Sequence, residues 1–321
     1  MNDQLITVAY LFSGILFILS LGGLSKQSTA KQGNILGMIG MAIAILATAL
    51  DPDVSGYEML GYSVAFGAIV GAVLAARVAM TSMPELVAIL NSFGGAAAAL
   101  VGIASFLDTS HSFAGVERTI HEVEVFIGVF IGAVTFTGSI VAFGKLRGWI
   151  GSKALALPGR NFWNILLLAV SIYLGTQFVG EPHDSAALSL WLMTALASLF
   201  GVIMVLAIGG ADMPVVVSVL NSYSGWAAAA SGFMLGNDLL IITGALVGSS
   251  GIILSYIMCS AMNRSFMNVI FGSFAATSKS KANQSEDGEE LVHTSIESEE
   301  AAQLMEEAKE VIIVPGYGMA V

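Results

Sequence analysis

Long apolar segments, each of about 20 residues, recur along the first 262 residues of this chain. A helix of this length crosses the hydrocarbon core of a bilayer, where every backbone polar group must be paired within the protein. Nine segments can be counted, at residues 5–24, 34–50, 57–77, 84–107, 124–143, 162–180, 188–208, 213–235 and 238–262. The sequence therefore predicts an all-α polytopic membrane protein with about nine transmembrane helices, which fill residues 1–264.

The overall composition agrees with a membrane protein and restricts its chemistry. Charged residues make up only 11% of the chain, against about 25% in ordinary soluble domains. The net charge of −11 comes largely from the C-terminal tail, and no basic patch suggests nucleic acid as a partner. Cys259 is the single cysteine, which excludes an internal disulfide and a CxxC metal site. We expect no metal ion.

The positions of lysine and arginine predict how the chain is oriented, because cytoplasmic loops carry an excess of both. With the N-terminus outside, the loops on the inner side hold all but one of them, and the exception is Arg118. The inner residues are Lys26, Lys31, Arg77, Lys145, Arg147, Lys153, Arg160, Arg264, Lys279, Lys281 and Lys309. This bias predicts nine spans, with the N-terminus outside and the C-terminus in the cytoplasm.

A stretch of 20 residues occurs twice, at 83–102 and at 213–232, and each copy contains Met-Pro followed by Leu-Asn-Ser. On a helix, Asn91 and Asn221 each share a face with small residues, which allow close approach of a second helix. The purely structural explanation is that these faces pack helices together and that each amide is hydrogen-bonded within the interface. Polar groups inside a membrane also mark pathways, and two copies at matched depth favour that interpretation.

The segments that follow the two copies match as well. Gly128 and Gly132 form a GxxxG pair in the fifth segment, as do Gly244 and Gly248 in the ninth. Both asparagine segments are even-numbered, so both run in the same direction. The pattern predicts a parallel internal repeat that relates segments three to five to segments seven to nine, an arrangement typical of transport paths.

Several polar residues near the segment ends are further candidates. Glu85 and Asp212 stand at the starts of the two asparagine helices, where an acid complements the helix dipole. They could also capture protons or pair with a cytoplasmic domain. Arg264 is either an anchor at the inner surface or a partner for such a domain, and Ser250 lies in a small polar run of the ninth segment. No histidine falls within a predicted span, so we expect the titrating group of any proton path to come from a partner subunit.

The tail differs in character from the rest. Residues 265–300 form an acidic linker, and Ser298 begins a helix. A short apolar strand at 311–314 precedes Gly316, Tyr317 and Gly318, which is how a dinucleotide-binding unit opens, although a lone GxG is more often a plain turn. Residues 301–321 are thus expected to be the truncated start of a Rossmann-like α/β domain that does not bind nucleotide by itself.

The sequence from Ala211 to Phe266, together with MPELVAILNSF and the terminal VIIVPGYGMAV, resembles the beta subunit of proton-translocating NAD(P) transhydrogenases. The resemblance covers essentially the whole chain. It implies a subunit of a bacterial inner-membrane enzyme that couples hydride transfer between NAD(H) and NADP(H) to proton movement. The complete beta subunit would bind NADP(H), an alpha subunit would bind NAD(H), and two alpha–beta units would form a dimer.

The resemblance also implies roles for individual residues. Asn221 matches an asparagine of the proton path, whereas Asn91 stands where many members have a proton-carrying histidine. Asp212 and Arg264 match residues that couple the membrane domain to the nucleotide domain, and Glu85 and Ser250 match sensitive positions. The NADP(H) fingerprint corresponds to Gly316, Tyr317, Gly318, Met319, Ala320 and Val321.

Two alternatives to the enzyme remain open at the level of sequence. One is a secondary transporter or proton channel subunit without nucleotide chemistry, in which the terminal GYG is an accident. The other is a membrane scaffold without catalytic function. Because the nucleotide domain is expected to be incomplete in this chain, we expect the chain to be inactive by itself.

Overall fold

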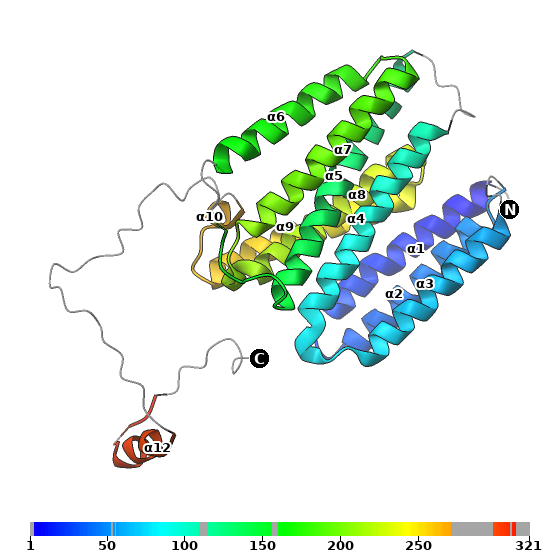
Figure 1. The fold of residues 1–321 in the computed structure, drawn as a ribbon. Helices are drawn as coiled ribbons and strands as arrows, with labels where there is room; N and C mark the ends of the chain where they lie inside the picture. Colours follow the sequence, from blue (N-terminus) through cyan, green and yellow to red (C-terminus); the bar gives the residue numbers. More distant parts are fainter. Residues whose placement is uncertain are drawn as a thin grey trace. The chain divides into compact units, whose positions relative to one another are not determined.

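The computed structural model describes residues 3–52, 54, 56–108, 115–155, 160–270, 298–308 and 310–312, and in these ranges it is helical with no strand. Nine of the helices in these ranges have 19 to 31 residues each (Figure 1). They are α1 (Asp3–Leu24), α2 (Ala30–Ala49), α3 (Tyr57–Arg77), α4 (Met83–Leu107), α5 (Val116–Leu146), α6 (Arg160–Phe178), α7 (His183–Leu206), α8 (Met213–Met234) and α9 (Asp238–Ala261). The short helix α10 (Phe266–Ile270) follows, and 3-10 turns precede α4 (Met80–Ser82) and α8 (Gly210–Asp212).

Seven helices within the described ranges are long and apolar enough to cross a membrane. The other two long helices differ for separate reasons. In α6 the apolar stretch, Phe162–Phe178, is shorter than in the other seven helices. The helix α8 has 22 residues but carries one asparagine and four serines, which lower its mean hydropathy. The structure therefore supports a polytopic helical membrane protein, while its count of clearly apolar spans is lower than the nine predicted.

The largest departure from the predicted boundaries is at α5. The sequence predicted a span from residue 124, whereas the helix begins at Val116 and has 31 residues. Its first two turns carry Glu117, His121 and Glu122, which were expected in a loop. The apolar positions Val125 and Val129 continue the spacing of four residues from His121, and this periodicity extends the helix toward its N-terminus.

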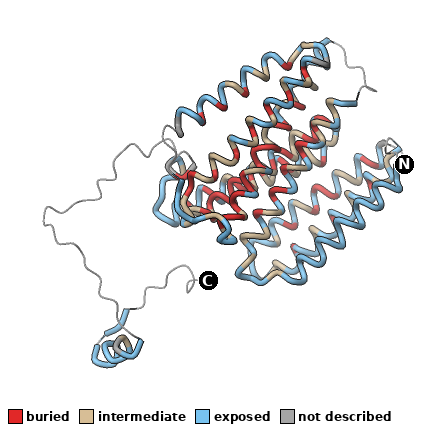
Figure 2. The backbone as a smooth tube through the Cα atoms, in the orientation of Figure 1, coloured by how far each residue is buried: buried red, intermediate tan, exposed pale blue. Residues whose placement is uncertain are grey.

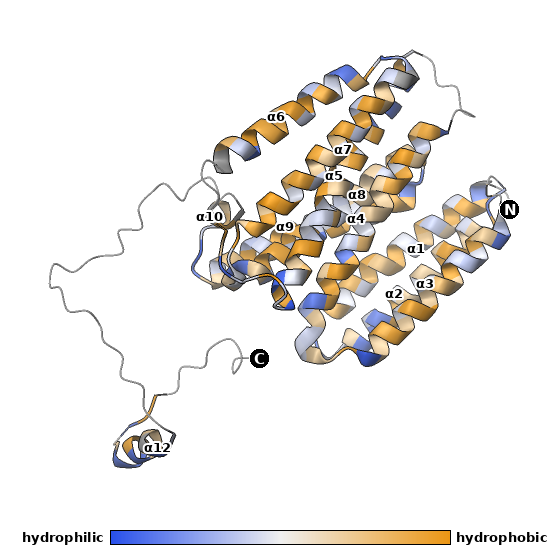
Figure 3. Cartoon of the chain, viewed as in Figure 1, coloured by the Kyte–Doolittle hydropathy of each residue, from blue (hydrophilic) through white to orange (hydrophobic). Residues whose placement is uncertain are grey.

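The buried residues are most numerous in α5 and α8, and α4, α7 and α9 contribute further ones; Figure 2 shows them in red in the centre of the helical bundle. One apolar cluster joins Val129 of α5 with Phe178 and Met193, and a second joins Ala142 with Val205 and Leu220. Figure 3 shows that the helices of the periphery remain largely hydrophobic. In α3 no residue is buried, although it is one of the seven apolar helices. An apolar exterior around a tightly packed centre is the arrangement that a lipid environment favours.

The helices α4 and α8 lie side by side and run in the same direction. Asn91 contacts Val217, a Cβ placed on Gly94 would lie 3.6 Å from Ser224, and one placed on Gly102 would lie 3.5 Å from the Met234 sulphur. Contacts that advance together along both helices occur only between parallel helices. The parallel direction predicted for the two asparagine helices is therefore confirmed within the bundle.

Each asparagine helix forms a tight antiparallel pair with the helix that follows it. Gly95 packs against the backbone of Gly132 in α5, and Gly225 packs against the backbone of Gly244 in α9. The Ser92 hydroxyl donates to the Phe136 backbone oxygen at 3.1 Å, and the Ser222 hydroxyl donates to the backbone oxygen of Gly248. Gly132 in the α4–α5 pair is thus the structural equivalent of Gly244 in the α8–α9 pair.

The sequence matched the two GxxxG pairs without a register between their glycines. The contacts set that register: Gly132 corresponds to Gly244, whereas Gly128 faces Met234 of α8. Sequence spacing within a GxxxG pair cannot fix the register, because each glycine of the pair can serve as the contact point.

The first two helices form a separate antiparallel hairpin. Gly23 packs on Gly33, and the Ser13 hydroxyl donates to the Gly40 oxygen at 2.7 Å. The hairpin touches α9 at Gly14 and Leu239.

Near the C-terminus, α12 (Ser298–Glu307) confirms the helix predicted to start at Ser298. Val311 and Ile312 form no strand, and the nucleotide-fingerprint residues Gly316 to Val321 lie outside the described residues.

Candidate functional site

Asn91 lies in the middle of α4 at the interface with α8, and only 6% of its surface is exposed. Its Nδ2 donates to the backbone oxygen of Val217 at 3.4 Å, and its Oδ1 accepts from the Ser224 hydroxyl at 3.4 Å. Both distances are long for hydrogen bonds, and a side-chain amide offers two donors and two acceptor lone pairs. Asn91 therefore links α4 to α8 through two long contacts, and its amide can still form further hydrogen bonds.

Asn221 lies at the corresponding position of α8 but in a different environment. It is half-buried, and its side chain forms no hydrogen bond with any described residue, while its backbone oxygen accepts from the Ser224 hydroxyl at 2.8 Å. Ser224 has one proton to donate, and its shorter contact is with Asn221 rather than Asn91. The structure thus brings Asn91 and Asn221 to one level of the bundle, bridged by Ser224, without a direct bond between the two amides.

Serines beside the asparagines, which the sequence analysis did not single out, hold the interface of α8 and α9. Ser218 donates to the Gly251 oxygen at 3.1 Å, and Ser222 donates one turn later to the Gly248 oxygen. Ser250, a predicted site residue, is exposed and donates to Val247 of its own helix at 3.0 Å. Ser250 therefore does not line the interface. The spacing of four residues between Ser218 and Ser222 was the signal that could have identified the correct pair.

An acidic residue and an arginine meet at the same end of each helix pair. Glu85 at the start of α4 lies 2.9 Å from Arg147, which follows α5. Asp212 precedes α8 and lies 3.7 Å from Arg264, which follows α9. The second distance allows a charge contact but no hydrogen bond, and Asp212 Oδ1 is buried without a hydrogen-bond partner in the described chain. Arg264 therefore holds the Asp212 charge loosely, whereas Arg147 holds Glu85 firmly.

Lys145 fixes the end of α7 close to Asp212. Lys145 was expected in a loop, but it belongs to the last turn of α5 and only 3% of its surface is exposed. Its ammonium group donates to the backbone oxygens of Leu206 at 2.8 Å and Ile208 at 2.6 Å. A cation at a helix C-terminus pairs with carbonyls that the helix itself leaves unbonded.

The loop after α5 reinforces the same region. The Gly210 amide donates to the Ser152 oxygen at 2.7 Å, and the Leu155 amide donates to the Leu206 oxygen at 3.0 Å. The turn that carries Asp212 is thereby tied to the loop after α5, and that loop is tied to the end of α7.

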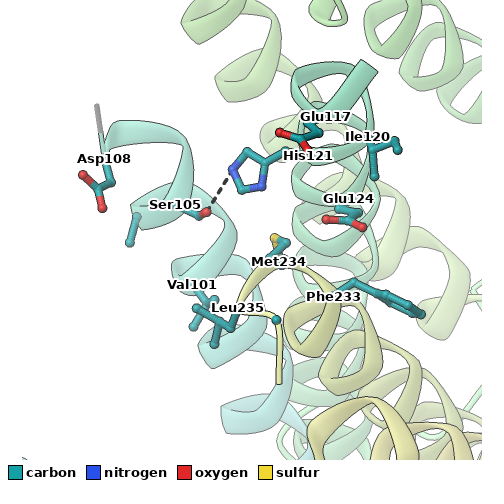
Figure 4. A pocket seen from close by; sticks show the side chains of 12 residues that line it. Val101, Ser105, Asp108, Glu117, Ile120, His121, Glu124, Phe233, Met234 and Leu235 are labelled. Atoms are coloured by element: carbon teal, nitrogen blue, oxygen red, sulfur yellow. Dashed lines mark hydrogen bonds between the residues drawn. The ribbon is translucent and has the colours of Figure 1, made fainter. Parts of the chain in front are cut away.

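At the opposite end of the bundle, α4, α5 and α8 line an open cavity of about 790 Å³ (Figure 4). Its polar lining comes from Ser105, Asp108, Glu117, His121 and Glu124. The His121 ring nitrogen Nε2 and the Ser105 hydroxyl are 3.2 Å apart and form a hydrogen bond between α5 and α4. We name this space the α4–α5–α8 cavity. His121 thus belongs to the first two turns of α5 and not to a loop, as had been expected.

The sequence as a whole matches one protein family. A profile of the NAD(P) transhydrogenase beta subunit family matches residues 6–321. The chain belongs to this family. It is also 47% identical to two proteins from Rhodospirillum rubrum, both named NAD(P) transhydrogenase subunit beta, over 324 aligned residues that cover 100% of this chain and 69% of each relative.

Membership of the beta-subunit family gives the resemblance seen in the sequence a firm basis. It does not favour a transporter or channel without nucleotide chemistry. The candidate NADP(H) residues Gly316, Tyr317, Gly318, Met319, Ala320 and Val321 lie outside the described residues. Within the described ranges, no group of three His, Cys, Asp or Glu side chains is placed so that it could hold a metal ion.

Proposed function

We propose that this beta subunit carries the proton path of an NAD(P) transhydrogenase and couples proton movement to hydride transfer between NAD(H) and NADP(H). The observation that carries the proposal is the bridged pair Asn91 and Asn221, placed between two parallel helices in the centre of an apolar bundle. Amides do not titrate near neutral pH, but they orient water and relay hydrogen bonds through donor and acceptor groups. Polar groups held at this depth are typical of ion pathways.

The two helix pairs support a mechanism by conformational coupling. We infer that α4–α5 and α8–α9 are repeats of one unit, because their glycine contacts, serine bonds and acid–arginine pairs correspond. Proton occupancy beside Asn221 would shift α8 against α9, and the loosely held Asp212 and Arg264 would pass the shift to the nucleotide domain. Glu85, held by Arg147, anchors the other pair.

The remainder of the assembly is inferred from the family. We propose that residues 1–264 form nine spans, with the N-terminus outside and the C-terminus in the cytoplasm of a bacterial cell, in its inner membrane. Residues 265–300 form the cytoplasmic linker, and residues 301–321 begin the NADP(H)-binding domain. The nucleotides, when bound, supply the hydride chemistry. An alpha subunit that binds NAD(H) completes the unit, and two alpha–beta units form a dimer.

The test is to reconstitute the complete complex in vesicles with Asn221→Leu. Leucine has a similar volume but neither donates nor accepts a hydrogen bond, so we expect loss of proton-coupled hydride transfer while both nucleotides still bind. Asn91→His is the companion variant and should be tolerated, because histidine keeps a polar, proton-carrying group between α4 and α8. Normal proton pumping by Asn221→Leu would remove the α4–α8 interface from the path.

A further inference from the structure

Ser224 has the one side chain among the described residues whose hydrogen bonds reach both Asn91 and Asn221. We propose that Ser224 is a positioning residue, which holds the side-chain amide of Asn91 against the turn of α8 that carries Asn221. The proposal rests on the proposed function, and it adds the residue through which the two asparagines of the α4–α8 interface act on each other.

Both polar ends of the Asn91 amide are directed at one turn of α8. Nδ2 donates to the Val217 backbone oxygen at 3.4 Å, and Oδ1 accepts from the Ser224 hydroxyl at 3.4 Å. In an α-helix the Val217 oxygen also accepts from the backbone N–H of Asn221, four residues later. The Ser224 hydroxyl in turn donates to the backbone oxygen of Asn221 at 2.8 Å. The groups that hold Asn91 are therefore bonded to the backbone of Asn221 on both sides.

The hydroxyl proton of Ser224 has two acceptors and can serve only one of them fully. Its contact with Asn221 is short, and its contact with Asn91 is long for a hydrogen bond. Whichever acceptor gains the proton, the other loses part of its bond. The orientation of the Asn91 amide consequently depends on the geometry of the Asn221 turn, and Ser224 need not carry a proton itself.

The internal repeat separates Ser224 from the general packing of the helices. Ser92 and Ser222 occupy equivalent positions in the two copies, and each donates to a backbone oxygen of the helix that follows. Position 224 corresponds instead to Gly94, and a Cβ placed there would lie 3.6 Å from the Ser224 Cβ. The α4–α5 pair thus packs without a hydroxyl at this position. Only the second copy places one beside the asparagines.

The experiment measures proton-coupled hydride transfer by the complete complex in vesicles with Ser224→Ala. Alanine preserves the helix but removes the donor. We expect kcat to fall roughly three- to tenfold, which is the factor that one hydrogen bond of ordinary strength contributes. KM for both nucleotides should stay within twofold of the wild type, since the substitution lies within the helical bundle. Ser224→Thr keeps the hydroxyl and should restore most of the turnover.

Ser231→Ala is the matched control. Ser231 is a buried serine of the same helix, and its hydroxyl donates to the Ala227 backbone oxygen at 3.0 Å. Its removal takes one hydroxyl from α8 without changing a bond to either asparagine, so kcat should remain at the wild-type value. Equal losses of kcat in Ser224→Ala and Ser231→Ala would show that serines of α8 serve only the fold, and would overturn the proposal.

A titratable reporter at position 91 tests the contact itself. In Asn91→His, the ring atoms bonded to Cγ take the places of the amide oxygen and nitrogen. The neighbouring groups Val217 on α8 and Phe136 on α5 do not titrate. A hydroxyl bonded to the ring favours one of its protonation states over the other. Adding Ser224→Ala should therefore shift the pH profile of turnover in Asn91→His, whereas adding Ser231→Ala should not.

The outcomes distinguish the positioning role from the function on which it rests. If the wild-type complex moves no protons during hydride transfer, the proposed function fails and the positioning role with it. If the wild type is coupled but Ser224→Ala keeps kcat within twofold of it, or leaves the pH profile of Asn91→His unchanged, the positioning role alone is wrong. Should Ser224→Ala not assemble, Ser224→Cys replaces it, because a thiol donates only weakly. Wild-type kcat in Ser224→Cys would then overturn the proposal.

Discussion

At the scale of single residues, the charged groups at the Asp212 end of the bundle differ in how firmly they are held. Lys145 is buried and donates two short hydrogen bonds, whereas Asp212 faces Arg264 at 3.7 Å with a buried oxygen left unbonded. A group that is fixed contributes to stability. A group that is incompletely paired can change partners, which suits a residue that couples two domains.

Arg264→Gln tests the coupling role of the loose pair. More than half of the Arg264 side chain is exposed, so we expect the free energy of unfolding to change by less than about 1 kcal/mol. Proton-coupled turnover of the complete complex should nevertheless fall. Arg77→Gln, at the exposed end of α3, is the control and should leave turnover unchanged. Equal turnover in both variants would show that Arg264 is only a surface anchor.

Lys145→Met should instead reduce stability. Methionine keeps the apolar stem but leaves the oxygens of Leu206 and Ile208 without their donor, at a cost of about 1–3 kcal/mol for a buried unsatisfied acceptor. The midpoint of thermal unfolding in detergent measures the effect. Lys153→Met, at an exposed position of the following loop, provides the comparison and should unfold at the wild-type temperature.

At the scale of helices, the two asparagine helices and their partners are packed through backbone contact. Gly225 approaches the backbone of Gly248 and Gly244 so closely that a Cβ there would overlap with the Gly248 backbone nitrogen. Helices in a membrane gain stability from such close packing rather than from the exclusion of water. The α8–α9 interface is consequently both rigid in register and sensitive to any added atom.

Gly225→Ala should therefore force α8 and α9 apart. Overpacking of this kind costs about 1–3 kcal/mol, and we expect a lower unfolding midpoint together with impaired coupling. Gly61→Ala in α3 is the matched control, because a Cβ at Gly61 meets nothing within 4 Å. Alanine also has the higher helix propensity, so the control should be neutral or slightly stabilising.

At the scale of the whole molecule, α7 connects two regions that the charge bias assigns to opposite sides of the membrane. It has 24 residues, which corresponds to a length of about 36 Å and exceeds the hydrocarbon core of a bilayer. Ser185 lies in its first turn, and Ser152 is bonded through its backbone oxygen to Gly210, which follows the last turn. The two serines mark the two ends of one helix.

Single cysteines at Ser152 and Ser185, in a Cys259→Ala background, should react with an impermeant thiol reagent from opposite sides. Both positions are exposed, and removal of the buried Cys259 leaves no other thiol. In vesicles of known orientation, Ser152→Cys should label from the cytoplasmic side and Ser185→Cys from the outside. Labelling of both cysteines from one side would contradict the proposed topology.

The helical membrane architecture could be predicted from the sequence because hydropathy is a local property. A run of apolar residues satisfies its backbone hydrogen bonds only as a helix in lipid, whatever its neighbours are. The repeated stretch around Asn91 and Asn221 and the resemblance to the family could also be recognised from the sequence. Both depend only on the order of residues along the chain.

Only the tertiary structure decided which of these residues meet. It placed Ser222 rather than Ser250 at the α8–α9 interface, aligned Gly132 with Gly244, and brought Lys145 and His121 into helices. Each of these results depends on the register and rotation of one helix against another. Those are set by contacts between distant segments, and many registers of two small-residue helices are equally compatible with their sequences.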